Sequence, residues 1–283
     1  MNTRLHKALR NPVVAGAALI VVGIVAVALL APWIAPHDPA EQFFDGLTLE
    51  GMPLAPGGQF LLGTDLLGRD LLSRLMFGAR TSLLIGVVAN GIAVGIGTLL
   101  GVAAGYAGGV TATLINRFTD LMMAFPALLL AIALAAIFAP SLWIVALVIA
   151  LVNWVWVARV IYAQTAALRK SEFIEAVRSL GANWPRILFV HIVPHLVPTM
   201  LVWATLGIST TVLLEATLSF LGIGVRPPTP SWGGIIFECQ SYFLDAPWLV
   251  FFPGAAILIL ALSFNILGDA LRDVLDPTQR GKS

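Results

Sequence analysis

The chain has 283 residues, of which 59% are hydrophobic and only 11% are charged. Its mean hydropathy is +0.93, and this composition excludes a water-soluble globular protein. With 16 basic and 15 acidic residues the net charge is +1, which excludes a nucleic-acid-binding surface built on excess positive charge. The single cysteine, Cys239, can form no disulfide within the chain, so helix packing and the bilayer must hold the fold.

Six stretches of the sequence are apolar enough to cross a bilayer, which takes about 20 residues of helix. The first is centred on Val13–Ile34, and its length favours a retained helix over a cleaved signal peptide, whose apolar region has about 7–15 residues. The other five are predicted at Ser82–Ala104, Leu121–Phe138, Leu142–Ala163, Leu196–Leu221 and Trp248–Leu267. Turn-forming residues at 105–109 and 139–141 separate the second, third and fourth of them.

The lysines and arginines predict the orientation, because positively charged loops stay on the cytoplasmic side. With the N-terminus inside, twelve of the 16 basic residues face the cytoplasm and four lie outside, namely Arg69, Arg74, Arg80 and Arg226. Both termini are therefore predicted to be cytoplasmic. We divide the chain into residues 1–80, which hold the N-terminal tail, the first span and an outer segment, and residues 81–283, a five-helix core with a cytoplasmic loop at 164–195.

The cytoplasmic loop carries the signals of a short helix. Ser171 can act as its N-cap, Glu172 and Glu175 suit the positive N-terminal end, and Gly181 can end it, so a helix is predicted over residues 172–180. Four apolar residues share one face, namely Phe173, Ala176, Val177 and Leu180. Amphipathicity alone leaves two roles open, a helix lying on lipid headgroups or a helix that enters a groove on a partner.

The loop also resembles a known motif. The EAA loop of binding-protein-dependent ABC importers reads Glu-Ala-Ala, three residues, Gly, nine residues, Ile-x-Leu-Pro. Four residues of this chain match that pattern at the same spacing: Glu175, Ala176, Gly181 and Pro194. Three positions depart from it: Val177, His191 and Val193. The resemblance implies that the predicted helix is the coupling helix that sits in a cleft of an ATPase subunit. Arg178, on its polar face, is included with the four matching residues as a coupling residue.

Three further blocks resemble the second permease subunit of the peptide/nickel ABC transporter permease family: FLLGTDLLGRDLLSRLMFGARTSL, LEATLSFLGIGVRPPTPSWG and FNILGDALRDVLDP. The resemblance implies an all-α, six-span protein of the bacterial inner membrane with the type I ABC importer permease fold. It also implies a path, shared with a sister permease, for dipeptides, oligopeptides, glutathione-like peptides or nickel chelates. An extracytoplasmic binding protein would deliver the cargo, and two ATPase subunits or one fused ATPase would hold ATP and Mg²⁺. The identity of the cargo stays open.

No catalytic, cofactor or metal site is predicted in this chain. Its only Gly-Lys pair, Gly281-Lys282, lacks the earlier glycine of a Walker A loop. His191 and His195 lie four residues apart and could share a metal, but no third ligand is near in sequence, which favours histidines at headgroup depth. The alternative functional class is a self-sufficient secondary transporter or channel, which would leave the cytoplasmic loop unexplained.

Polar residues inside the spans are candidates for the translocation path. Glu215 is the one acid well inside a predicted span, and three roles compete for it: contact with cationic substrate, a proton site, or hydrogen-bonded pairing near the outer end of the fifth span. Asn153 is the second path candidate. Asn90 and Asn265 are weaker ones, because amide side chains often serve only to link helices.

Glycines at four-residue spacing predict close helix packing along the second span. They are Gly91 and Gly95, and a second set of Gly97, Gly101 and Gly105 that recurs near one face. The pattern leaves open whether the partner is another span of this chain or the sister permease.

The outer segments are predicted to be loops apart from one short helix. After Gly68 an apolar stripe of Leu71, Leu72, Leu75 and Met76 predicts a helix lying on the membrane surface, with Asp70 and Arg74 paired on its polar side. This helix could belong to an outer gate, dock a binding protein or anchor the chain. Residues 222–247 are predicted to be a rigid loop, with Trp232 and Trp248 among its aromatic interface anchors and Cys239 simply packed.

Overall fold

The computed structural model describes residues 10–139 and 141–275, and this part of the chain is helical without β-strands. Five helical runs are long and apolar enough to cross a membrane: α2 (Pro12–Ile34), α3 (Leu71–Ala107), α6 (Leu142–Arg169), the run Trp184–Phe220 that ends in α9 (Val193–Phe220), and α11 (Trp248–Leu275). A bent pair, α4 (Gly109–Ala124) and α5 (Ala127–Ile137), makes a sixth when taken as one span. The predicted all-α bundle of apolar spans is confirmed.

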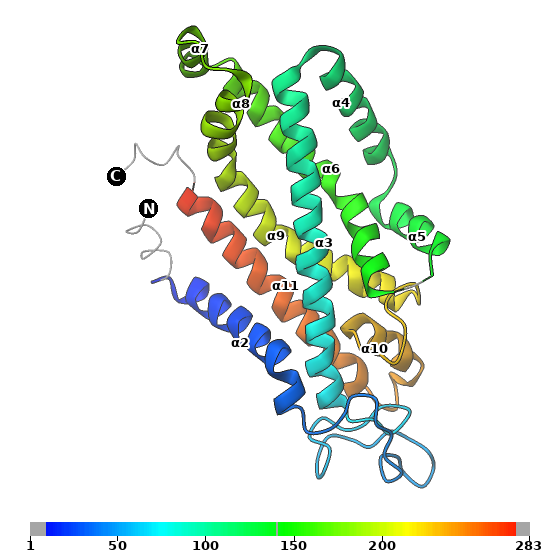
Figure 1. The fold of residues 1–283 in the computed structure, drawn as a ribbon. Helices are drawn as coiled ribbons and strands as arrows, with labels where there is room; N and C mark the ends of the chain where they lie inside the picture. Colours follow the sequence, from blue (N-terminus) through cyan, green and yellow to red (C-terminus); the bar gives the residue numbers. More distant parts are fainter. Residues whose placement is uncertain (1–9, 140, 276–283) are drawn as a thin grey trace.

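The bundle has two distinct ends (Figure 1). The short helix α7 (Glu172–Ser179) lies at one end, beside the turn between α3 and α4, and we call this the α7 end. Residues 35–70 and α10 (Trp232–Cys239) lie at the other, which we call the α10 end. Across the bundle, α2 lies at one edge and α4 and α5 at the opposite edge, with α3 between them.

Close packing of α3 against α6 depends on three glycines. A Cβ atom on Gly97 would lie 2.7 Å from the Trp154 carbonyl oxygen, and one on Gly101 would lie 2.7 Å from the Ala158 carbonyl oxygen. A Cβ on Gly105 would likewise lie 2.6 Å from a side-chain atom of α6. The partner of this glycine face is therefore α6 of the same chain. Gly91 and Gly95 have no such neighbour within 4 Å.

The third predicted span, Leu121–Phe138, is not one continuous helix. The chain bends by 92° between α4 and α5, at Phe125 and Pro126. Proline lacks the backbone N–H of a helix interior and disfavours helical geometry at the residue before it, so the helix stops there. The helix before the bend begins already at Gly109, because Gly108, at φ +69°, ends α3.

The prediction of a separate surface helix in residues 1–80 is also wrong, since Leu71 to Met76 form the first turns of α3. Asp70 is the N-cap of α3, and its carboxylate accepts a 3.0 Å hydrogen bond from the Ser73 N–H. Arg74 is only 1% exposed and pairs with Asp65 and Glu238 rather than with Asp70. Residues 35–70 cover the polar side of this part of α3, and sequence periodicity cannot predict that contact.

The second outer segment is partly helical instead of a loop. Its helix α10 buries Trp232, which is 2% exposed and donates a 3.0 Å hydrogen bond from Nε1 to the Leu75 carbonyl oxygen. Trp232 is therefore packed against α3, and its prediction as an aromatic interface anchor is wrong. Cys239, at the end of α10, is buried as expected.

An ion-pair network ties the α10 end together. Arg69 donates to Asp65 at 2.7 Å and to Glu238 at 2.6 Å, and Arg74 bonds to the same two carboxylates. Three of these four side chains are at most 6% exposed, and Glu238 is 22% exposed. Because buried charges are tolerated only when paired, this network fixes the loop before α3 and helix α10 to α3.

The topology can be tested with fusions to alkaline phosphatase, an enzyme that is active only outside the cytoplasm. Because twelve of the 16 basic residues favour a cytoplasmic α7 end, we expect no activity from a fusion after Leu180 and high activity from a fusion after Ser231. The opposite pattern, or equal activity at both sites, would contradict the orientation.

The glycine contact predicts that Gly101→Val destabilises the protein, because the new side chain collides with α6. Overpacking of this kind costs about 1–3 kcal/mol. The matched control is Gly95→Val on the same helix, where no neighbour lies within 4 Å. Heating in detergent, followed by size-exclusion chromatography, should show a lower midpoint for Gly101→Val only.

Candidate functional site

Helix α7 begins at Ser171 and carries acidic residues in its first turn. The Ser171 hydroxyl donates to the Leu168 carbonyl oxygen at 2.7 Å and does not bond to α7, so the N-cap is made by its backbone carbonyl, which accepts from Glu175 N–H at 3.1 Å. Glu172 and Glu175 lie near the positive end of the helix dipole, which favours negative charge.

The C-terminal end of α7 is a Schellman motif centred on Gly181. Its φ is +83°, the left-handed region that glycine enters at little cost. The Gly181 N–H donates to the Arg178 carbonyl at 3.0 Å and the Ala182 N–H donates to the Val177 carbonyl at 3.3 Å. The predicted helix stop at Gly181 is confirmed, and the motif fixes the direction in which the chain leaves α7.

One residue anchors α7 to the bundle. Ile174 is 1% exposed and packs in an apolar cluster with Val157 and Ile161 of α6 and with Ile187 and Ile192 of the next helical segment. The predicted apolar face did not include Ile174. The sequence did contain a signal for the burial of Ile174, since it precedes Val177 by three residues and shares a helix face with it.

The rest of α7 faces away from the bundle. Phe173 is 50% exposed and Leu180 is 88% exposed, while Glu175, Ala176 and Arg178 are also exposed. Val177 is half-buried beside Ile174. In the segment after α7, Trp184 and Phe189 are exposed as well, at 62% and 66%. The predicted face is therefore split: Val177 packs beside Ile174, whereas Ala176 and Leu180 are exposed and Phe173 is half-exposed.

The helix after α7 contains an irregular segment that leads to Pro194. Asn183 caps α8 (Trp184–Arg186), and the chain continues through a π-helical segment, Ile187–Ile192, into α9. The Val193 N–H bonds to the Leu188 carbonyl, five residues back. Pro194 has no N–H to donate, which removes one α-helical bond at this point. The π-helical segment beside this proline is therefore the irregular part of an otherwise regular helical run.

His191 and His195 lie on the side of this segment that faces α7. Their rings are 5.5 and 6.2 Å from the Phe173 ring, and the His195 Nδ1 lies 2.6 Å from the His191 carbonyl oxygen, to which it donates. No group of three or more metal-ligating side chains occurs in residues 10–139 and 141–275. The two histidines thus contact Phe173 and backbone rather than each other.

Glu215 of α9 is fully buried and hydrogen-bonded. Its carboxylate accepts a 3.0 Å bond from the Ser82 hydroxyl on α3 and a 2.8 Å bond from the Ser219 hydroxyl one turn further along α9. Both serines are buried, so neither hydrogen-bond partner of Glu215 is exposed. This arrangement is that of a paired internal acid.

The serines around Glu215 continue to the start of α10. The Ser231 hydroxyl lies 3.4 Å from the Ser219 hydroxyl and accepts a 3.1 Å bond from the Gly234 N–H, so it caps α10. A Cβ on Gly233 would lie 2.4 Å from the Ala216 carbonyl oxygen. The polar cluster around the acid therefore joins α3, α9 and α10 where these helices pack most closely.

The three asparagines have different surroundings. Asn90 donates a 2.6 Å bond from Nδ2 to the Ala204 carbonyl oxygen, so it links α3 to α9. Asn153 on α6 is half-buried and makes no side-chain hydrogen bond within the described residues, and Asn265 on α11 is exposed. Only Asn90 acts as the helix-linking amide that the sequence suggested.

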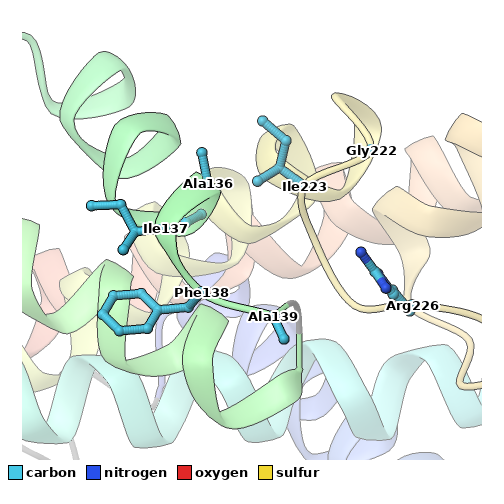
Figure 2. Close-up of a pocket in the computed structure, with 8 residues that line it drawn as sticks. Ala136, Ile137, Phe138, Ala139, Gly222, Ile223 and Arg226 are labelled. Carbon is cyan, nitrogen blue, oxygen red and sulfur yellow. The ribbon is translucent and has the colours of Figure 1, made fainter.

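A pocket of about 440 Å³ lies between the end of α5 and the chain after α9 (Figure 2). It is lined by Ile137, Phe138, Ile223 and small residues, with Arg226 as its one charged lining residue. Figure 2 shows Arg226 on the segment after α9, across from Ala139. An apolar pocket with a lone cation holds no acid, base or nucleophile for catalysis.

Comparison with known proteins gives matches over nearly the whole chain. Residues 97–281 match the family described as binding-protein-dependent transport system inner membrane component, and residues 5–56 match the N-terminal transmembrane domain of oligopeptide transport permease C. The chain is 45% identical over 264 residues to the di/tripeptide transport system permease protein DppC of Pseudomonas aeruginosa, which covers 93% of this chain and 87% of that protein. It is 42% identical over 265 residues to the glutathione transport system permease protein GsiD of Escherichia coli, with 94% and 86% covered.

The fold is also similar to a solved structure. An inward-facing form of the MetNI methionine ABC transporter contains a chain that matches with a TM-score of 0.59, covering 72% of this chain and 96% of that one. The sequence identity is 17%, so this match bears on the fold alone.

The contacts of Glu215 predict that Glu215→Ala destabilises the protein, because two buried serine hydroxyls lose their acceptor. An unsatisfied buried polar group costs about 1–3 kcal/mol. We expect a lower midpoint of thermal unfolding in detergent, a smaller loss for Glu215→Gln, and no change for Glu50→Ala at an exposed acid. A wild-type midpoint for Glu215→Ala would show that these bonds do not hold the helices.

Proposed function

The chain belongs to the family of binding-protein-dependent transport system inner membrane components, and we propose that its cargo is a short peptide. It is a multi-pass permease subunit of an ABC importer in the inner membrane. The proposed cargo is supported by the relatives, whose names give di/tripeptides and glutathione, and these favour peptides over nickel chelates. The alternative of a self-sufficient secondary transporter or channel has no support among the matches.

We propose that α7 is the element that couples this permease to an ATPase subunit. Its exposed residues Leu180, Glu175 and Arg178, together with the half-exposed Phe173, offer an apolar and charged surface. Ile174 and the Gly181 motif hold this surface in one orientation, which a helix docking into a cleft requires. ATP and Mg²⁺ would then be bound by the ATPase, and this chain would be non-catalytic.

The remaining partners follow from the same proposal. A sister permease would complete the path, two ATPase subunits or one fused ATPase would dock at the α7 end, and a binding protein would dock at the α10 end. The ion pairs at the α10 end support this arrangement, because they tie Asp65 and Arg69 of the outer segment to α3 and α10.

Under this proposal the two path candidates, Glu215 and Asn153, have different roles. The serine bonds of Glu215 favour a structural role over contact with cargo or a proton-carrying role, since a buried paired acid is not accessible to a passing peptide. Glu215→Gln should therefore reduce uptake of cationic and neutral peptides alike. Asn153, half-buried and without a side-chain partner in the described residues, remains the path candidate of this pair.

The coupling proposal predicts that Gly181→Val leaves the permease inserted but lowers ATPase co-purification or separates hydrolysis from uptake. A β-branched residue at φ +83° is strained by about 1–2 kcal/mol, which would change the exit angle of α7. Glu175→Arg should act in the same direction, because a cation near the N-terminal end costs about 0.3–1 kcal/mol before any partner contact is counted.

The matched control is Gly181→Asn, since asparagine enters the left-handed region far more readily than valine. No atom lies within 4 Å of a Cβ at this position, so the two variants differ in backbone strain and not in collisions. Membranes should be assayed for ATPase pulled down with the tagged permease and for peptide uptake. Normal values of both for Gly181→Val and Glu175→Arg would refute α7 as the coupling element.

A further inference from the structure

The buried acid Glu215 has no positively charged side chain as a partner in the part of the chain that the structure describes. None of the ion pairs within residues 10–139 and 141–275 includes it, and its side chain is 0% exposed. A carboxylate in this position needs another source of positive charge, or it has to take up a proton. The surrounding hydrogen bonds distinguish the two states, because a carboxylate only accepts them and a protonated carboxyl group also donates one.

One chain of hydrogen bonds reaches Glu215 from the first residue of α10. The Trp232 N–H donates to the Ser82 hydroxyl oxygen at 3.4 Å, and the Ser82 hydroxyl donates to Glu215 Oε2 at 3.0 Å. Trp232 is in the first turn of α10, where N–H groups have no partner within the helix. Ser82 therefore connects one of these free N–H groups to the acid.

A second chain of hydrogen bonds reaches the other oxygen of Glu215. The Gly234 N–H donates to the Ser231 hydroxyl oxygen at 3.1 Å, and the Ser231 hydroxyl lies 3.4 Å from the Ser219 hydroxyl oxygen, to which it donates. The Ser219 hydroxyl then donates to Glu215 Oε1 at 2.8 Å. Both carboxylate oxygens are thus acceptors, and both chains begin at N–H groups in the first turn of α10.

These N–H groups form the positive end of the α10 dipole, which favours a nearby negative charge. Close packing keeps this end of the helix against the acid. A Cβ on Gly233 would lie 2.4 Å from the Ala216 carbonyl oxygen of α9, and a Cβ on Gly78 of α3 would lie 2.9 Å from the Trp232 side chain. The field of the helix is therefore screened little by water, because the serines, Trp232 and Glu215 are all buried.

The other end of α10 has the complementary arrangement. Glu238, one residue before the end of the helix, pairs with Arg69 at 2.6 Å and with Arg74 at 3.0 Å. Positively charged groups are favourable near the C-terminal end of a helix. With a carboxylate at its start and two guanidinium groups near its end, α10 would be held at both ends by charges that suit its dipole.

We propose that Glu215 is ionised and positions α10, with the N-terminus of that helix as its counter-charge through Ser82 and the Ser219–Ser231 pair. A protonated Glu215 would have to donate a hydrogen bond from an oxygen that already accepts one from a serine. The carboxylate, in contrast, uses every hydrogen that the two chains direct at it. This role does not depend on which cargo the transporter carries.

The native cysteine reports whether α10 is in place. Cys239 is the last residue of α10, the only cysteine of the chain and 1% exposed. Burial raises the pKa of its thiol to about 12, so the thiol should react with a maleimide only when α10 moves away from its neighbours. The rate of labelling can be measured in the assembled transporter, with the subunits separated on a gel afterwards.

Glu215→Gln is the decisive variant, because an amide resembles the protonated acid, with one donor and one acceptor. Against two serine donors and a helix N-terminus it loses the charge and sets an NH₂ group against a hydroxyl hydrogen. We expect Cys239 to be labelled about tenfold or more faster than in the wild type. The matched control is Thr211→Val, one turn earlier on α9, where the buried hydroxyl has no partner among the described residues, and it should keep the wild-type rate.

A wild-type labelling rate for Glu215→Gln would overturn the proposal, since a neutral acid predicts that this variant behaves normally. For the same reason, failure of Glu215→Gln to assemble while Thr211→Val assembles would support an ionised acid. Infrared spectra at neutral pH, in a detergent without ester groups, give a second measurement. We expect no C=O band of a protonated carboxyl group in the wild-type-minus-Glu215→Gln difference spectrum, and such a band would refute the ionised state.

Discussion

Each charged or strongly polar side chain in the helix bundle has to be paired within protein or reached by water, because hydrocarbon offers it no hydrogen bond. The chain meets this constraint in three ways. At the α10 end, Arg69 and Arg74 are buried against two carboxylates. Deeper in the bundle, Glu215 takes its bonds from serines of two helices. Between α4 and α6, Asp120 and Arg159 pair with each other and stay half-exposed.

Helix α3 takes part in the first two of these solutions. It carries Arg74 at its start, Ser82 beside the buried acid and Asn90 against α9. It then packs on α6 through Gly97, Gly101 and Gly105. Polar contacts to α9 and α10 at one end and a glycine contact to α6 at the other give α3 fixed neighbours along its length. Helix α6, which packs on α3, in turn contacts both α5 and α7.

Composition and periodicity predicted the spans, the α7 helix and its glycine stop because these depend on local sequence. The bend at Pro126 also depends on local sequence, but the apolar residues on both sides of the proline favoured the prediction of one span. Arg74 and Trp232 were misplaced for a different reason: residues 35–70 and α10 cover them, and both contacts are long-range. The Asp120–Arg159 pair joins residues 39 apart in sequence, so neither charge indicated its partner.

Ile174 connects the proposed coupling helix α7 to α6. Ile174 packs with Val157 and Ile161, which flank Arg159 on α6. Because α6 is one uninterrupted helix from Leu142 to Arg169, Ile174 packs against a regular helix that has no break. On its other side α7 joins α9 through the π-segment before Pro194, where the regular bonding pattern is broken. Helix α7 therefore packs on a regular helix on one side and leads through an irregular segment into the helix that bears Glu215 on the other.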